Sequence, residues 1–177
     1  MSFKTDLTKS QKIFNLIKPD LEQRFNCKVI EVENNNADAC MKLDTVAGID
    51  YLLYSEFDNI PILDGLASRI QCGINRQTFT IRYKKASGCT TEHEKRKFAI
   101  DNGCIYPKYT LQAYFTGNSI NYAVCYTKDL IEHLESIPEQ KREKNNTSNA
   151  DFYIVKWDKV RLLANVNIQL KHQLKAS

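Results

Sequence analysis

Short apolar runs separated by turn residues dominate the middle of the chain. Three of them follow one another within Ile49–Tyr54, Ile62–Cys72 and Thr78–Lys84. The apolar stretches are too short for helices and are bounded by polar turn residues, so the pattern predicts three adjacent strands.

Polar side chains interrupt these three runs. The interruptions are Asp50 in the first run, Arg69 and Gln71 in the second, and Arg82 in the third. Because an unpaired buried charge is costly, polar residues on such strands usually line a site. Arg69 and Gln71 lie two residues apart and share one face of their strand. The alternative is that this face is exposed to solvent, as one face of an antiparallel sheet often is.

Helices and further strands flank this stretch. Ser10–Phe25 has apolar residues at three- and four-residue spacing, and Pro19 within it predicts a kink or break near Lys18. The other predicted helices are Thr91–Asp101, which starts with a capping box, and Thr127–Glu135. The other predicted strands are Cys27–Val32, Tyr109–Phe115, Ile120–Tyr126 and Asp151–Trp157. Lys159–Gln173 has helical spacing that Asn165 and Asn167 weaken.

The order of these elements predicts an α/β (α+β) fold, with a central mixed sheet flanked by helices. We expect a single domain over residues 1–177, because no composition shift marks a boundary. The most polar segment, residues 137–149, is expected to be a flexible loop.

Composition places the chain among ordinary globular proteins. Its 177 residues are 42% hydrophobic and 26% charged, and the net charge of +4 permits a nucleic-acid partner without requiring one. The six cysteines form no C-x-x-C pair, residues 1–11 are too polar for a signal peptide, and no apolar run approaches membrane length. We therefore expect a reducing, cytoplasmic setting without membrane contact.

The order of helix, strand, strand with a lone Asp, strand with two alternating polar residues, helix and strand resembles the core of the PD-(D/E)XK nuclease superfamily. Restriction endonucleases and Holliday-junction resolvases belong to it. The resemblance covers about residues 10–116 and leaves 117–177 as a C-terminal extension. Gly48-Ile49-Asp50 is similar to the first motif, and Arg69-Ile70-Gln71 occupies the place of the (D/E)-x-K motif.

The resemblance implies an Mg²⁺-dependent endonuclease that hydrolyses DNA phosphodiester bonds. Asp50 and Glu22 would bind the metal, Gln71 would orient water, and Arg69 would offset charge on the phosphate. Basic residues expected to contact DNA are Arg82, Lys84, Lys95 and Arg96. Family members commonly dimerise, so a homodimer is a further expectation.

Arg69 departs from the family pattern, which has an acid in its place. A migrated acid would complete the site, and the candidates are Glu56, Asp58, Asp64 and Glu92. Without one, the chain would be a non-catalytic domain of the same fold that binds nucleic acid or protein.

Two other groups have two interpretations each. The helix start Glu92–Lys97 is either a solvated face or, through its basic residues, a contact for phosphate. The second group, which belongs either to the body of the sheet or to a surface on which bases stack, is Tyr106, Tyr109, Gln112 and Tyr114.

Overall fold

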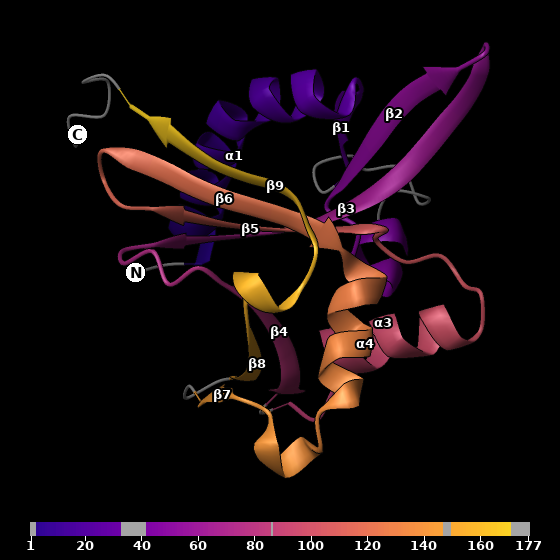
Figure 1. Cartoon of the computed structure of the whole chain (residues 1–177), viewed down its shortest axis with the longest axis vertical. Coiled ribbons are helices and arrows are strands. Elements are labelled where there is room, and N and C mark those ends of the chain that lie inside the picture. The colour runs from indigo at the N-terminus through magenta and orange to yellow at the C-terminus, as the bar shows by residue number, and fades with distance from the viewer. Residues whose placement is uncertain (1–2, 33–41, 86, 147–149, 171–177) are drawn as a thin grey trace.

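A mixed sheet of six strands forms the centre of the computed structural model, which describes residues 3–32, 42–85, 87–146 and 150–170 (Figure 1). In spatial order its strands are β1 (Lys28–Glu31), β2 (Tyr51–Phe57), β3 (Ile60–Cys72), β5 (Tyr109–Phe115), β6 (Ser119–Tyr126) and β9 (Leu162–Gln169). β3 and β5 run parallel, whereas the other neighbours are antiparallel. The predicted mixed sheet is therefore confirmed.

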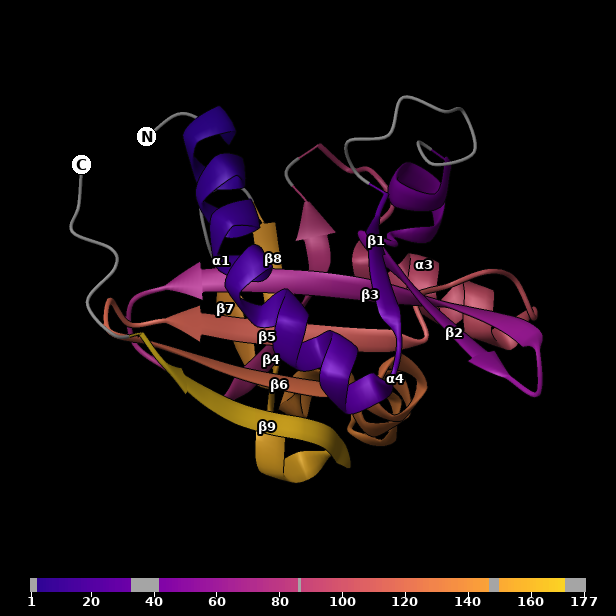
Figure 2. The same ribbon diagram turned by 90° about the horizontal axis from the view of Figure 1, so that it is seen from above.

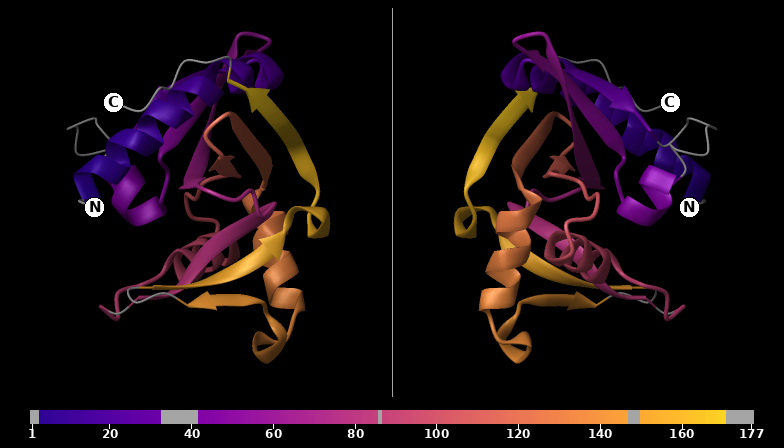
Figure 3. Two further views of the ribbon diagram at one scale, coloured as in Figure 1. Left: turned by 90° about the vertical axis from the view of Figure 1, so that its left-hand side faces the viewer. Right: turned by 90° about the vertical axis from the view of Figure 1, so that its right-hand side faces the viewer.

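Helices and a second, smaller sheet cover the two faces of the large sheet. The helices are α1 (Phe3–Phe25), α3 (Glu92–Asp101) and α4 (Thr127–Ser136). The small antiparallel sheet has the order β4 (Thr78–Lys85), β8 (Ala150–Lys156) and β7 (Lys144–Asn146). α1 crosses one face of the large sheet, and the small sheet lies with α3 and α4 beyond the other face (Figures 2 and 3). The predicted α/β domain with a flanked central sheet is confirmed.

Each face of the large sheet has its own apolar core. On β5, Leu111 and Ala113 pack into the core beneath α1, while Tyr114 packs into the core beneath α4 and the small sheet. This follows from the period of two along a strand, which sends alternate side chains to opposite faces. Arg69 on β3 and Gln112 on β5 stand opposite each other in the register and on the face away from α1.

α1 is longer than predicted and continues through Pro19. It begins at Phe3 instead of Ser10, and of the predicted kink or break near Lys18 the break is absent. A proline inside a helix costs about 3 kcal/mol, whereas each fully buried large apolar side chain contributes about 1.5–3 kcal/mol. The buried stripe of α1 outweighs the proline; its members are Ile13, Phe14, Ile17 and Leu21. None of the described helices is long and apolar enough to cross a membrane.

The three apolar runs are not three neighbouring strands. β2 and β3 pair as predicted, but β4 leaves the large sheet and pairs with β8. The free edge of β3 is taken instead by β5, which arrives in parallel after α3. A parallel neighbour needs such a crossover connection, and here the connection includes β4.

A short helical turn precedes β2. Residues 38–41 lie outside the described residues, and Leu43–Ala47 forms the π-helical turn η1. The turn ends at Gly48, whose φ of +68° is a left-handed conformation that glycine adopts without strain. The reversal at Gly48 brings the chain to Asp50 at the start of β2.

The C-terminal third is an integral part of the fold and not an appendage. The helix considered at Lys159–Gln173 is instead the strand β9, along which exposed Asn165 and Asn167 alternate with less exposed apolar residues. The predicted loop 137–149 contains the short helix η2 (Glu139–Lys141) and β7, while residues 147–149 lie outside the described residues.

Gly65 on β3 has no room for a side chain. A Cβ atom there would lie 2.8 Å from Ile49 Cδ1, 2.9 Å from Ile49 Cγ1 and 3.2 Å from Pro107 Cα. Because Ile49 is fully buried, we expect Gly65→Ala to lower the free energy of unfolding by about 1–3 kcal/mol in urea titrations. In an Ile49→Ala background, which removes the two nearest atoms, the same substitution should cost less. An equal cost in both backgrounds would contradict this account of Gly65.

Candidate functional site

A polar cavity of about 300 Å³ lies between the large sheet, β4 and the start of α3. Its basic lining residues are Arg69, Arg82, Lys85, Lys95 and Arg96, and its acidic ones are Asp44, Asp50 and Glu92. The charged lining therefore has an excess of two positive charges. Such a surface attracts anions and concentrates them locally.

Asp50 lies where the ladder between β2 and β3 begins. Its backbone N–H donates to Leu66 O at 3.0 Å, and its Oδ2 accepts a hydrogen bond of 2.6 Å from the backbone N–H of Ser68. The side chain thus continues the pairing of β3 beyond the start of β2. These bonds fix the carboxylate at the cavity wall beside the residues of β3.

Glu92 connects three elements at the cavity. From the first turn of α3, its Oε1 forms an ion pair with Arg69 of β3, and its Oε2 accepts a hydrogen bond of 3.2 Å from the backbone N–H of Arg82 on β4. Burial alone would raise the pKa of the Glu92 carboxyl, but attraction to Arg69 and Arg96 and the bond from Arg82 outweigh it. The pKa is therefore lowered, and Glu92 is ionised at neutral pH.

The face that carries Arg69 is mostly covered and not an open sheet surface: Ala67 is buried, and Arg69 and Gln71 are only partly exposed. The guanidinium groups of Arg69 and Arg82 lie 4.8 Å and 5.5 Å from the centre of the Phe152 ring, a cation–π arrangement. Phe152, on β8, closes this side of the two arginines.

A bulge decides which lysine of β4 reaches the cavity. The register with β8 shifts between Arg82 and Lys84, which interrupts the alternation of side chains. Lys85 lines the cavity, whereas Lys84 is exposed and its Nζ lies 4.0 Å from Asp151 Oδ2. The predicted phosphate contacts Arg82, Lys95 and Arg96 do line the cavity, and Lys84 does not.

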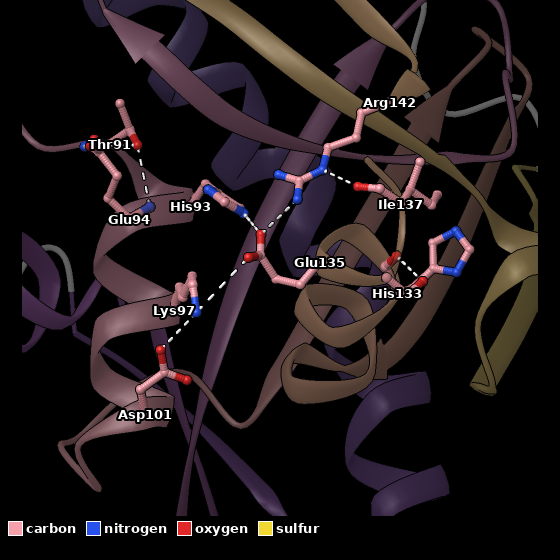
Figure 4. A network of polar contacts seen from close by, with 10 residues as sticks. Thr91, His93, Glu94, Lys97, Asp101, His133, Glu135, Ile137 and Arg142 are labelled. Atoms are coloured by element: carbon pink, nitrogen blue, oxygen red, sulfur yellow. Dashed lines mark hydrogen bonds and ion pairs between the residues drawn. The ribbon is translucent and has the colours of Figure 1, made fainter. Parts of the chain in front are cut away.

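Polar contacts from α4 and the segment after it hold α3 in place (Figure 4). Glu135 Oε1 lies 3.0 Å from His93 Nε2 and 3.1 Å from Arg142 Nη2, while Arg142 Nε donates to Ile137 O. At the start of the helix, Thr91 and Glu94 form the predicted capping box. The end of α3 that carries Glu92 and Arg96 is thereby positioned from two sides.

Two predicted site residues do not reach the cavity. Glu22, near the end of α1, accepts a hydrogen bond of 3.0 Å from the backbone N–H of Val29 and is not among the cavity-lining residues. Gln71 lies on the same face of β3 as Arg69 but about 7 Å farther along the strand. It lines a different hollow, near Thr78. Of the predicted catalytic and metal-binding residues, the structure brings Asp50 and Arg69 to one cavity, together with Glu92 and Arg96 of α3, and leaves Glu22 and Gln71 outside it.

Among the candidate migrated acids, the structure brings Glu92 to Asp50. Asp64 instead pairs with Lys108 at 2.8 Å, Glu56 bonds the hydroxyl of Tyr54, and Asp58 lies in the β2–β3 turn. Glu92 could be foreseen as a candidate because it follows a helix cap, but its approach to Asp50 depends on how α3 packs against β4.

Two residues of β5 and η1 were not predicted at the site. Gln112 is only 1% exposed and Asp44 lines the cavity from η1, where burial raises the pKa of its carboxyl against the attraction of Lys95. Tyr114 is fully buried and hydrogen-bonded to Thr78, so the stacking-surface interpretation of Gln112 and Tyr114 is wrong. The only sequence signal for Gln112 was a polar residue inside an apolar strand.

The acids at the cavity have the donor chemistry that Mg²⁺ prefers. Asp50 and Glu92 offer carboxylate oxygens from two elements, and Glu92 already binds a cation, the guanidinium of Arg69. No group of three or more His, Cys, Asp or Glu residues in the described chain is arranged to hold a metal. Mg²⁺ is often held by one or two carboxylates together with water and substrate phosphate, so the pair Asp50 and Glu92 fits this ion.

The buried histidine of α3 makes stability depend on pH. Burial lowers the pKa of His93, although Glu135 opposes the shift. Below the ordinary histidine pKa near 6.5, the unfolded chain binds the proton more readily, so protonation favours unfolding and stability rises with pH. We expect the free energy of unfolding to fall from pH 7 to pH 5.5 more steeply in the wild type than in His93→Gln. His133→Gln, a histidine change on α4, is the control. Greater wild-type stability at pH 5.5 than at pH 7 would mean that the pairing with Glu135 dominates.

Comparison with known proteins adds no relative to this geometry. No protein-family model matches the chain, and no match is found among curated proteins or solved structures. The function therefore has to be inferred from the cavity itself and from the order of the elements around it.

Proposed function

We propose that this protein is a metal-dependent nuclease-like enzyme that hydrolyses phosphodiester bonds of DNA, with a site formed around Asp50 and Glu92. One observation carries the proposal: Asp50 and Glu92, from different parts of the chain, line one cavity in which basic side chains outnumber acidic ones. Acids suit a divalent cation, and the basic groups suit phosphate.

The arrangement around the cavity supports this proposal. The chain passes through α1, β1, Asp50 with β2, then β3 with Arg69, and later α3 and β5. This is the order on which the resemblance to PD-(D/E)XK nucleases rests, with β4 as an addition before α3. The departures are also clear, because an arginine stands where that family has an acid, and the second acid comes from α3.

Asp50 and Glu92 would hold the metal ion in this proposal. A bound divalent cation polarises the scissile phosphate and makes a bound water more acidic. Arg69 has a second role, since engagement of Glu92 with a metal would release its guanidinium to pair with a phosphate oxygen. Lys95, partly exposed one turn farther along α3, would hold the neighbouring backbone phosphate.

A non-catalytic phosphate-binding role is the second candidate. It is favoured by one observation: both carboxylate oxygens of Glu92 are already bonded within the chain, to Arg69 and to the backbone of Arg82. If these bonds persist when DNA binds, the protein would bind nucleic acid without cleaving it.

Substitutions that keep side-chain shape test the proposed site. We expect Asp50→Asn and Glu92→Gln each to lower Mg²⁺- or Mn²⁺-dependent cleavage of DNA by about 100-fold or more, because each removes a charge that holds the metal. Glu22→Gln and Gln71→Ala, which alter predicted residues that lie outside the cavity, should cleave like the wild type. Cleavage is followed on linear and circular DNA, with EDTA as the metal-free control.

Three results would contradict the assignment. One is undiminished cleavage by both Asp50→Asn and Glu92→Gln. Another is loss of cleavage in Glu22→Gln with a native fold, which would return the site to the end of α1. The third is wild-type protein that binds DNA in a salt-dependent way yet never cleaves it with either metal, which would establish the second candidate.

A further inference from the structure

Two residues that line the cavity carry buried hydrogen-bond donors without partners in the described chain. Arg82 Nε and Gln112 Nε2 are buried and have no hydrogen-bond partner among the described residues. Buried polar groups are nearly always paired, and a missing partner costs about 1–3 kcal/mol. Both residues line the same cavity, so a ligand in it would lie beside both side chains.

Arg96 adds a buried charge to these donors. Its side chain is on α3, the residue is only 7% exposed, and its guanidinium makes no hydrogen bond or salt bridge to the described chain. Glu92 and Asp50 attract it from beyond salt-bridge distance. Burial lowers the pKa of Arg96, yet a guanidinium keeps its proton in proteins. A buried charge without a direct partner destabilises the fold, and its presence is explained if an anion binds there.

In the described chain, the side-chain amide of Gln112 is paired at one atom only. Its Oε1 accepts a hydrogen bond of 3.1 Å from Thr80 Oγ1, and its Nε2 has no partner among the described residues. Arg96, Gln112 and Arg82 together present donors only. The ligand group that fits is therefore an acceptor with several oxygens and negative charge.

The charge balance favours a dianion. The cavity lining has an excess of two positive charges. A phosphate monoester carries about −1.5 to −2 at pH 7, whereas a phosphodiester inside a strand carries about −1. A terminal phosphate matches the excess, and an internal phosphate leaves about half of it.

The shape of the site agrees with a terminal group. The volume of about 300 Å³ suits a phosphate with its sugar and is too small for a duplex. A second hollow of about 260 Å³ shares Asp50, Ser68, Arg69 and Arg82 with the cavity and continues to Gln11 on α1. A strand whose end lies on Gln112 has a path out of the cavity through this hollow.

We propose that Arg96, Gln112 and Arg82 form a receptor for a phosphate monoester dianion, and that the terminal phosphate of a nucleic-acid strand occupies it. This inference rests on the proposed function for the identity of the strand. It adds that strand ends are recognised by their phosphate and that recognition does not require the metal.

The test measures binding without metal. One oligonucleotide sequence is prepared with a 5′-phosphate, with a 3′-phosphate and with neither, and binding to the full chain is measured by fluorescence polarisation in EDTA. We expect one phosphorylated form to bind at least about tenfold more tightly than the unphosphorylated form, a difference of about 1.4 kcal/mol. Inorganic phosphate should compete and should raise the melting temperature of the free protein.

Variants then assign the effect to the receptor. Gln112→Met and Arg96→Met should remove most of the preference for phosphorylated ends and the melting shift with inorganic phosphate. Arg96→Met should also be at least as stable as the wild type without phosphate, because it removes a charge that lacks a direct partner. Lys84→Met, on the exposed side of β4, should weaken all three oligonucleotides alike and keep the preference.

Equal binding of the three oligonucleotides by the wild type, with no melting shift in phosphate, would overturn the receptor even if a variant fails to fold. If inorganic phosphate raises the melting temperature but displaces none of the oligonucleotides, the receptor binds a small anion, and the strand end is refuted as its ligand. Cleavage without end preference would sink the receptor alone. End preference in EDTA without cleavage in Mg²⁺ or Mn²⁺ would sink the proposed nuclease and leave the receptor standing.

Discussion

The carboxylate of Glu92 is the contact on which the rest of the site depends. It joins α3, where it originates, to Arg69 on the large sheet and to the backbone of Arg82 on the small sheet. Without this contact, α3 would lose its bonds to β3 and β4 at the cavity, and Arg69 would lose its ion-pair partner. A buried ion pair adds little net stability, but the loss of one partner is costly because the other charge is left unpaired. The pair of Glu92 and Arg69 therefore mainly determines the geometry of the site.

The same contact leaves the cavity with one neutralised arginine and several donors that remain available. Glu92 neutralises one of the nearby guanidinium groups, yet Arg96 and the donors of Gln112 and Arg82 have no direct partner within the part of the chain that the structure describes. The fold tolerates this cost because the two apolar cores on either side of the large sheet supply the stability. Proteins commonly sacrifice local stability at functional sites in this way, and we consider the unpaired donors the clearest sign of function in the chain.

Local sequence patterns predicted most elements and part of the site. The alternation in β2, β3, β5, β6 and β8 and the capping box of α3 depend on neighbours in the sequence, so periodicity was sufficient to locate them. The pairing of β4 with β8 and the place of β9 at the sheet edge depend on contacts between distant segments, which periodicity does not encode. For the same reason Asp50, Arg69 and Arg96 were identified one by one, whereas Gln71 and Glu22 were grouped with them and lie elsewhere. The place of Gln112 at the cavity was not predicted, because it depends on the pairing of β5 with β3, which sets Gln112 beside Arg69.

The most direct test of the central claim is a crystal structure of the protein soaked with Mn²⁺, with anomalous data collected near the manganese edge. The account predicts an anomalous peak in the cavity, coordinated by carboxylate oxygens of Asp50 and Glu92, with the guanidinium of Arg69 moved away from Glu92. An empty cavity at saturating Mn²⁺, with Arg69 still bonded to Glu92, would contradict it.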